Sequence, residues 1–245
     1  MVVSAQLNQE PKKITKKFFS EHNYIENITP ALKKKKGFTN YQELLSYIDE
    51  KVQKYPELVS SNFIGESQKG KKIPILYIIK NSDDDIKKLR VWMQGGLHGN
   101  EPASTESLLY LIHLILEDPN YNYLLDKIEL AISPMANIDG SLKNDRYAAN
   151  GLDLNRDHTK IMAPETKASI KAFNNFNPHV ALDFHEYRPF RKDFAQLGSF
   201  GISNPYDVMF LYTGNLNVPE NIRVIIDTLF VKNATTPLDE LNLRH

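Results

Sequence analysis

Short apolar segments with the character of β-strands alternate along this chain with segments whose apolar residues recur at helical spacing. This alternation constrains the fold more than any other feature, because strands that alternate with helices form a sheet with helices packed on both faces. A QKGKK turn joins the first two strands and makes them a hairpin, so part of the sheet is antiparallel. We therefore predict an α/β fold of three layers, α/β/α, around a mixed parallel and antiparallel sheet. The expected strands are 61–67, 73–80, 90–94, 128–133 and 179–184.

The helices are predicted from capping residues and apolar stripes. Thr39 to Gln42 has the pattern of a capping box and opens an apolar stripe that Pro56 ends. Residues 102–116 are apolar on nearly every side, which predicts a buried helix. Pro164 suits the first position of another helix, and a last helical stripe lies between residues 222 and 230.

The composition is that of a globular protein and excludes several classes of function. Of the 245 residues, 41% are hydrophobic and 24% are charged, which suits one sizeable core. Lysine plus arginine and aspartate plus glutamate both number 30, so the basic excess of nucleic-acid-binding proteins is missing and no such partner is expected. The absence of cysteine excludes disulfides, thiolate catalysis and cysteine-ligated zinc.

The beginning of the chain differs from the rest. Residues 1–38 carry PKKITKK and KKKK runs without a matching apolar face, which is typical of a solvated N-terminal arm. We expect this arm to precede one catalytic domain over residues 39–245. No apolar run approaches the roughly 18 residues that cross a bilayer, so no membrane span is expected. Residues 1–6 are too short for a signal peptide but compatible with a trimmed one, which favours export over the cytoplasm slightly and leaves compartment and oligomeric state open.

Three polar segments follow the third, fourth and fifth predicted strands. Ligand sites of α/β sheets gather beyond the carboxyl ends of strands. The first segment, GGLHGNE, contains His98 and Glu101 as an H-x-x-E pair, and His185 directly ends the fifth strand. If Glu101 opens the buried helix, its side chain and that of His98 can converge on one point above the strand end.

Two histidines and a glutamate form a ligand set that suits zinc. Imidazole nitrogen and carboxylate oxygen suit zinc, and three such ligands leave an open coordination position, which a catalytic zinc needs for water or a substrate carbonyl. Taken singly, Glu101 could instead favour the dipole at a helix start, and His185 could be structural. Asp183 either orients a ligand histidine or makes a local hydrogen bond at its strand end, and both interpretations stay open.

The loop after the fourth strand reads NIDG, then Arg146, then GLDLNRD with Asn155 and Arg156. NIDG alone is an ordinary turn sequence, and an Asn-Arg pair alone is an ordinary surface pair. Two arginines and an asparagine facing a metal, however, form a set that can recognise a carboxylate, because the guanidinium group is a rigid bidentate donor.

In this combination the chain resembles the M14 family of zinc metallocarboxypeptidases, of the carboxypeptidase A type. The matching motifs are GGLHGNE, NIDG, the R-x(4)-G-x-D-L-N-R run that ends at Arg156, and the strand-ending His185, in that order. The resemblance extends from the helix near Thr39 to about residue 187. It implies a zinc-carboxypeptidase-like fold and the hydrolysis of C-terminal peptide bonds.

The resemblance also implies a cofactor and its ligands. His98, Glu101 and His185 would bind one Zn²⁺. The partners would be the C-termini of peptides or proteins, with cell-wall peptides as a related substrate class.

Three further residues receive roles from the same resemblance. Asn155 and Arg156 would hold the C-terminal carboxylate of the substrate. Arg146 would be the catalytic residue that polarises the scissile carbonyl and stabilises the oxyanion beside the metal, in keeping with preplaced positive charge where negative charge develops.

The match fails after the third ligand. The family also uses a general-base glutamate and a tyrosine that covers the substrate, both well downstream of His185. Glu186 adjoins a ligand, and its side chain is expected to point away from the metal, whereas Glu220 and Glu240 match no catalytic position. We therefore expect that the C-terminal part of the domain is missing from this sequence, together with the pocket that sets side-chain preference.

Two other functions remain open. A zinc deacylase of the aspartoacylase or succinylglutamate desuccinylase kind resembles GGLHGNE and DLNR equally well, although the NIDG turn and the glycine before DLNR favour the peptidases. A non-hydrolytic, zinc-dependent module that binds peptide ends is motivated by the unmatched glutamate.

Overall fold

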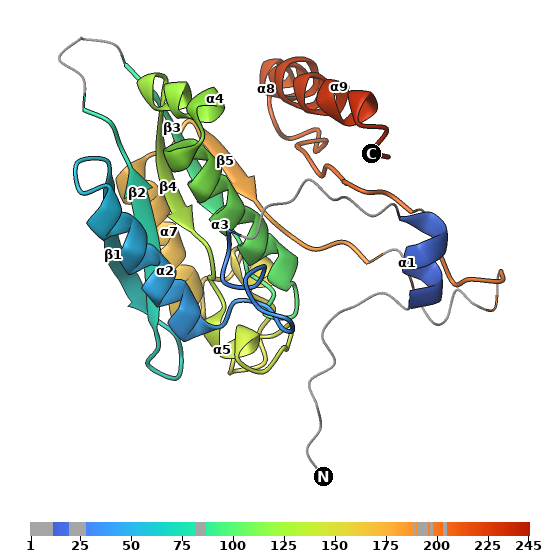
Figure 1. Ribbon diagram of the computed structural model, residues 1–245, viewed down its shortest axis with the longest axis horizontal. Helices are drawn as coiled ribbons and strands as arrows, with labels where there is room; N and C mark the ends of the chain where they lie inside the picture. Colours follow the sequence, from blue (N-terminus) through green and yellow to red (C-terminus); the bar gives the residue numbers. More distant parts are fainter. Residues whose placement is uncertain are drawn as a thin grey trace. The chain divides into compact units, whose positions relative to one another are not determined.

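A computed structural model describes residues 12–19, 28–81, 87–188, 190, 196, 198–202 and 205–245 (Figure 1). The chain divides into two compact units. One comprises residues 1–8 and 25–186, and the other comprises residues 9–24 and 187–245. The predicted division into an arm of residues 1–38 and a domain of residues 39–245 stays a prediction.

The first unit is built on a five-stranded sheet of order β1-β2-β4-β3-β5. β1 pairs antiparallel with β2 and β2 with β4, whereas β3 pairs parallel with both β4 and β5. The prediction of a mixed sheet with an antiparallel hairpin is therefore confirmed. The strands are β1 (Val59–Glu66), β2 (Lys72–Ile78), β3 (Leu89–Gln94), β4 (Ile128–Ser133) and β5 (Val180–Asp183).

Helices cover both faces of this sheet, as Figure 1 shows. Side chains alternate across a strand, and the core divides accordingly. Leu130 and Ile132 of β4 join the core cluster formed with α2 (Tyr41–Lys54) and α3 (Pro102–Glu117), whereas Ala131 joins a cluster with α7 (Pro164–Phe176). These three layers are the predicted architecture.

The start of α2 differs from the prediction. The capping residue is Asn40, not Thr39. The Asn40 side chain accepts from the backbone N–H of Glu43, and the Glu43 carboxylate accepts from the backbone N–H of Asn40. The prediction of a capping box was therefore wrong by one residue. The reason is tertiary, because the hydroxyl and N–H of Thr39 both donate to Glu106 on α3, 67 residues away.

Helix α3 is buried as predicted, with seven buried residues over 16. Helix α7 begins at Pro164 as predicted and ends at Phe176, because the C-cap residue Asn177 adopts the left-handed conformation with a φ of 51°. The segment between β4 and α7, expected as one long loop, contains the short helices α5 (Ile138–Ser141) and α6 (Leu154–Asp157). Two further short elements, α4 (Pro119–Asn122) and the 3₁₀ turn η1 (Tyr123–Asp126), connect α3 to β4.

In the second unit, the described residues form helices, one isolated β-bridge between Phe190 and Ile202, and segments without regular structure. It contains α1 (Lys12–Phe18) and a continuous run of α8 (Glu220–Ile225), the π-helical segment η3 (Ile226–Val231) and α9 (Lys232–Glu240). This run confirms the helix predicted around residues 222–230. No helix among the described residues has both the length and the apolar character that crossing a membrane requires.

Candidate metal centre

The three predicted ligands lie just after two neighbouring parallel strands, β3 and β5. Gln94, the last residue of β3, pairs with Ser133 of β4 on one side and with Asp183 of β5 on the other. The carboxyl ends of all three strands therefore lie at one edge of the sheet. His98 and Glu101 follow β3, and His185 follows β5, so the sheet topology itself brings them together.

The loop between β3 and α3 is held by close backbone packing. Gly96 has a φ of 62°, a conformation that favours glycine, and its N–H donates to the hydroxyl of Ser104 at 2.8 Å. At Gly99 a Cβ atom would lie 2.1 Å from the carbonyl carbon of Gly140 and 2.2 Å from the amide nitrogen of Ser141. Only glycine fits there, and the contact presses the loop against α5.

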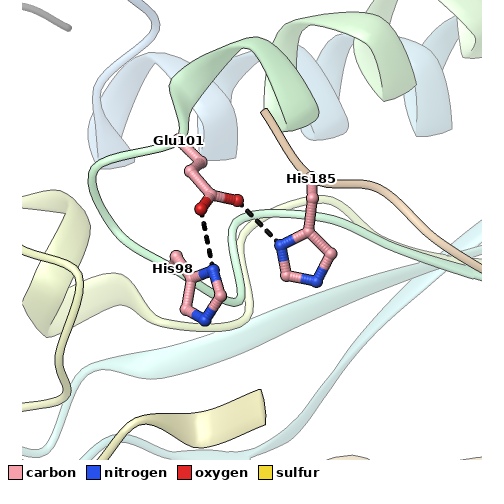
Figure 2. A group of neighbouring side chains, drawn as sticks. All are labelled: His98, Glu101 and His185. Atoms are coloured by element: carbon pink, nitrogen blue, oxygen red, sulfur yellow. Dashed lines mark hydrogen bonds and ion pairs between the residues drawn. The ribbon is translucent and has the colours of Figure 1, made fainter. Parts of the chain in front are cut away.

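Glu101 is the N-cap residue of α3, but its side chain makes no capping hydrogen bond. The carboxylate is directed instead at the two histidines (Figure 2). Glu101 Oε1 lies 2.8 Å from Nδ1 of His98, and Oε2 lies 2.7 Å from Nδ1 of His185. One ligand atom from each of the three residues lies within 4.8 Å of the others.

Each histidine is also bonded on its second ring nitrogen. His98 Nε2 lies 3.1 Å from Oδ1 of Asp153, and His185 Nε2 lies 3.0 Å from Oδ2 of Asp183. A carboxylate on the outer nitrogen fixes the tautomer and orientation of a histidine, and it raises the basicity of the nitrogen that faces the ligand. Of the two interpretations of Asp183, the structure favours the one in which it orients a histidine.

The electrostatics of the cluster favour positive charge at its centre. Burial by itself would raise the pKa of the Glu101 carboxyl, but hydrogen bonds to His185 and His98 outweigh it and lower that pKa to about 2. Hydrogen bonds to Asp183 and Glu101 raise the pKa of His185 to about 9. Burial likewise acts to raise the pKa of Asp153, yet His98 and Arg146 hold it below its usual value.

This donor set fits a zinc ion. Two imidazole nitrogens and one carboxylate are a known ligand set of catalytic zinc, with a coordination position left open. Both Nδ1 atoms face the carboxylate and both Nε2 atoms are held from outside. Within the described part of the chain, no other group of three or more such residues brings its ligand atoms this close.

Arg146 lies at the same cluster. Its Nε donates to Oδ2 of Asp153 at 3.1 Å, and its Nη1 lies 3.4 Å from Oε1 of Glu101. The side chain remains 35% exposed, so the guanidinium group is held at the candidate metal centre and is still open to solvent.

Asn155 and Arg156 lie on α6, directly after Asp153. Asn155 Nδ2 lies 3.5 Å from Nε2 of His185, which places it at the cluster. Arg156 is exposed, and its guanidinium has no hydrogen-bond or ion-pair partner among the residues that the structure describes. This group is thus available to a ligand.

Two residues of the site were not singled out for the roles they have. Asp153 caps α6 through Asn155 N, holds His98 and anchors Arg146. The signal for it was the aspartate inside GLDLNRD, which reads as an ordinary N-cap. The Glu186 side chain accepts from Ala103 N at 3.2 Å. The two residues lie 83 positions apart in the chain, so no local sequence pattern predicts this contact.

The chain is similar in sequence to known zinc carboxypeptidases. Residues 44–190 match the protein family Peptidase_M14, described as zinc carboxypeptidase. Carboxypeptidase 2 of Trichophyton rubrum is 35% identical over 189 residues, which cover 73% of this chain and 34% of that protein. The chain thus spans about one third of the length of this curated relative.

Solved structures show the same fold. Carboxypeptidase A from Helicoverpa armigera has a TM-score of 0.56 at 24% identity, covering 62% of this chain and 47% of that chain. A metallo-carboxypeptidase from Burkholderia cenocepacia has a TM-score of 0.56 at 23% identity, covering 61% and 42%. At these identities the likeness concerns the fold, and it confirms the carboxypeptidase-like architecture predicted from the sequence.

Proposed function

Because the chain belongs to the zinc carboxypeptidase family Peptidase_M14, we propose that it is part of a zinc-dependent exopeptidase that releases residues from the free C-terminal end of peptides. The observation that carries this proposal is the convergence of His98, Glu101 and His185, whose ligand atoms lie within 4.8 Å of one another. We assign these three side chains as the ligands of one zinc ion.

Zinc, when bound, would supply a Lewis acid that polarises the substrate carbonyl and lowers the pKa of water. Asp153 and Asp183 keep the two ligand histidines oriented through their outer nitrogens. Arg146, fixed by Asp153, directs a second positive charge toward the carbonyl oxygen, where negative charge develops during peptide hydrolysis.

Asn155 and Arg156 recognise the free carboxylate of the substrate. Asn155 lies beside His185, and the guanidinium of Arg156 is exposed and without a partner in the described structure. A guanidinium can form two parallel hydrogen bonds to a carboxylate. This arrangement supports peptides with a free C-terminus as substrates, with peptides of the cell wall as a related class.

The ligand assignment is tested by measuring bound zinc after equilibrium dialysis. We expect about one zinc ion per wild-type chain, and a loss of at least tenfold in affinity for His98→Ala and His185→Ala, since each removes one of three ligands. The matched control is His158→Ala, because His158 bonds to the carbonyl of Leu154 and does not contact the cluster. Equal zinc content in His98→Ala and wild type would refute the assignment.

The substrate assignment is tested with paired peptides that differ only in a free or an amidated C-terminus. Arg156→Ala is expected to raise KM about 10- to 100-fold, and Arg146→Ala to lower kcat about 100- to 1,000-fold, the loss typical of one oxyanion donor. Lys160→Ala, which removes a nearby exposed charge, is the control. Binding of the free-carboxylate peptide without any released amino acid would instead support the non-hydrolytic binding module, and faster hydrolysis of N-acyl amino acids would support the deacylase.

A further inference from the structure

The N-terminus of α3 is capped by a residue from the segment that follows β5. The first backbone N–H groups of a helix have no partner within it, and the N-cap side chain usually accepts from one of them. At α3 this residue is Glu101, whose two carboxylate oxygens are occupied by His98 and His185. Its side chain makes no capping bond, so the helix start needs an acceptor from elsewhere.

Glu186 supplies that acceptor. Its Oε2 accepts from the N–H of Ala103, the second residue of α3, at 3.2 Å. A carboxylate at this position is also favoured by the positive end of the helix dipole. The backbone N–H of Glu186 donates in turn to Oε2 of Glu101 at 3.1 Å. Glu186 is therefore bonded both to the carboxylate of Glu101 and to the helix that Glu101 opens.

The two hydrogen bonds of Glu186 lie between the segments that carry the proposed metal ligands. β5 lies at the edge of the described sheet and pairs only with β3 there. Directly after β5, the N–H of Phe184 donates one more hydrogen bond to the carbonyl of Gln94 at 2.8 Å. The next residue is His185, and the one after it is Glu186. The bonds of Glu186 thus join the segment that carries one ligand to the segment that carries another.

We propose that Glu186 is a positioning residue that keeps His185 beside Glu101. It does so by capping the N-terminus of α3, which the Glu101 side chain leaves uncapped. The inference rests on the proposed zinc site, since zinc affinity is the property that the position of His185 controls. Glu186 contacts α3 through its carboxylate, which accepts from Ala103 N, and contacts Glu101 through its N–H, which donates to the oxygen that also faces His185. Its effect on zinc is therefore exerted through the two ligands.

Zinc affinity, measured by competition with a chelating dye, tests this role in Glu186→Ala and Glu186→Gln. We expect Glu186→Ala to weaken zinc binding about 10- to 100-fold, the range found when partners of metal ligands are removed. Glu186→Gln keeps an oxygen that can accept from Ala103, so it is expected to stay within about threefold of wild type. Glu186→Asp, with a shorter side chain, should fall between the two.

The matched control is Asn40→Ala, which removes the cap of α2 at a site remote in sequence from the three ligands. It should lower the urea midpoint of unfolding as Glu186→Ala does, while zinc affinity stays unchanged. If Glu186→Ala only lowers the urea midpoint and binds zinc as wild type does, Glu186 is a plain helix cap and the proposal is overturned. If Glu186→Ala does not fold, equal weakening in the Asp and Gln variants overturns it.

Failure of the underlying function looks different. A wild-type chain that binds no zinc would overturn the proposed zinc site itself, and the positioning role with it. A wild type that binds zinc tightly, next to a Glu186→Ala variant that binds it equally well, would leave the zinc site standing and remove only the positioning role.

Discussion

Each histidine of the candidate metal centre is bonded to a carboxylate through the ring nitrogen that faces away from Glu101. For His98 this partner is Asp153, and for His185 it is Asp183. The two aspartates differ in their surroundings, since Asp153 is 15% exposed in its side chain and also bonds Arg146, whereas Asp183 is 36% exposed. Asp153 therefore joins His98, a proposed metal ligand, to Arg146, the proposed oxyanion residue.

Replacing Asp153 by asparagine should disturb both functions at once. We expect Asp153→Asn to weaken zinc binding about 10- to 100-fold, because the orienting carboxylate of His98 is lost. Since the ion pair that fixes Arg146 is also lost, kcat should fall further than zinc occupancy alone explains. Zinc titration and steady-state kinetics at saturating zinc separate the two effects.

Asp126→Asn is the control for this variant, because Asp126 pairs with Lys80 and is exposed. It should match wild type in both measurements. Asp153→Asn with wild-type zinc affinity and a normal kcat would show that the contacts of Asp153 with His98 and Arg146 have no functional weight.

At the scale of elements, α2 and α3 are joined by an ionic cluster. Glu117 near the end of α3 accepts from Nζ of both Lys51 and Lys54 of α2. Lys51 is 4% exposed in its side chain, so its charge is buried and needs this partner. Burial would raise the pKa of Glu117, but hydrogen bonds from Lys51 and Lys54 lower it to about 2.

This shift predicts a pH dependence of stability. A carboxyl whose pKa is depressed from 4.5 to about 2 contributes fully above pH 4.5, and the contribution is lost as pH falls from there toward 2. We expect Glu117→Gln to lower the free energy of unfolding at pH 7 by about 2 kcal/mol, within the range for hydrogen bonds to charged groups. The difference from wild type should shrink markedly at pH 3 in urea titrations.

The exposed Glu57 provides the comparison. Glu57→Gln should change stability by less than about 0.5 kcal/mol at either pH, as surface substitutions do. A Glu117→Gln effect that is the same at pH 7 and pH 3 would mean that the charge of Glu117 is not what joins the two helices.

For the whole molecule, the candidate metal centre depends on the sheet. The proposed ligand Glu101 lies 84 residues before His185 in the chain, His98 lies earlier still, and no element contains all three. A ligand that binds the folded chain and not the unfolded chain stabilises the fold by mass action. Zinc should therefore act on the stability of the unit that carries the sheet.

Zinc at about 100 times its dissociation constant is expected to raise the free energy of unfolding by about 2.7 kcal/mol. Thermal unfolding with and without zinc measures the effect, and a chelator should reverse it. Magnesium should have no comparable effect, because it prefers six oxygen ligands. An equal increase in the His98→Ala variant would show that zinc acts at another site.

Much of this protein could be read from the sequence alone, for a local reason. Strands and helices have distinct periods of apolar residues, so Ile128–Ser133 was placed without error and Pro164 marked the start of α7. Glycines that tolerate no Cβ, such as Gly99, belong to a motif visible in the chain. The order of the motifs and the types of their side chains were enough to predict the fold, the family and the three residues of the candidate metal site.

The tertiary structure decided the partners of those residues, because they come from segments far apart in the chain. Asn40 and not Thr39 caps α2, because the N–H and hydroxyl of Thr39 donate to Glu106 of α3. Asp153 became the partner of His98, and Glu186 became the cap of α3, through contacts that span 55 and 83 residues. Local sequence determines which groups are able to bind, whereas hydrogen bonds across the fold determine which of them meet, since only the folded chain brings such distant groups within bonding distance.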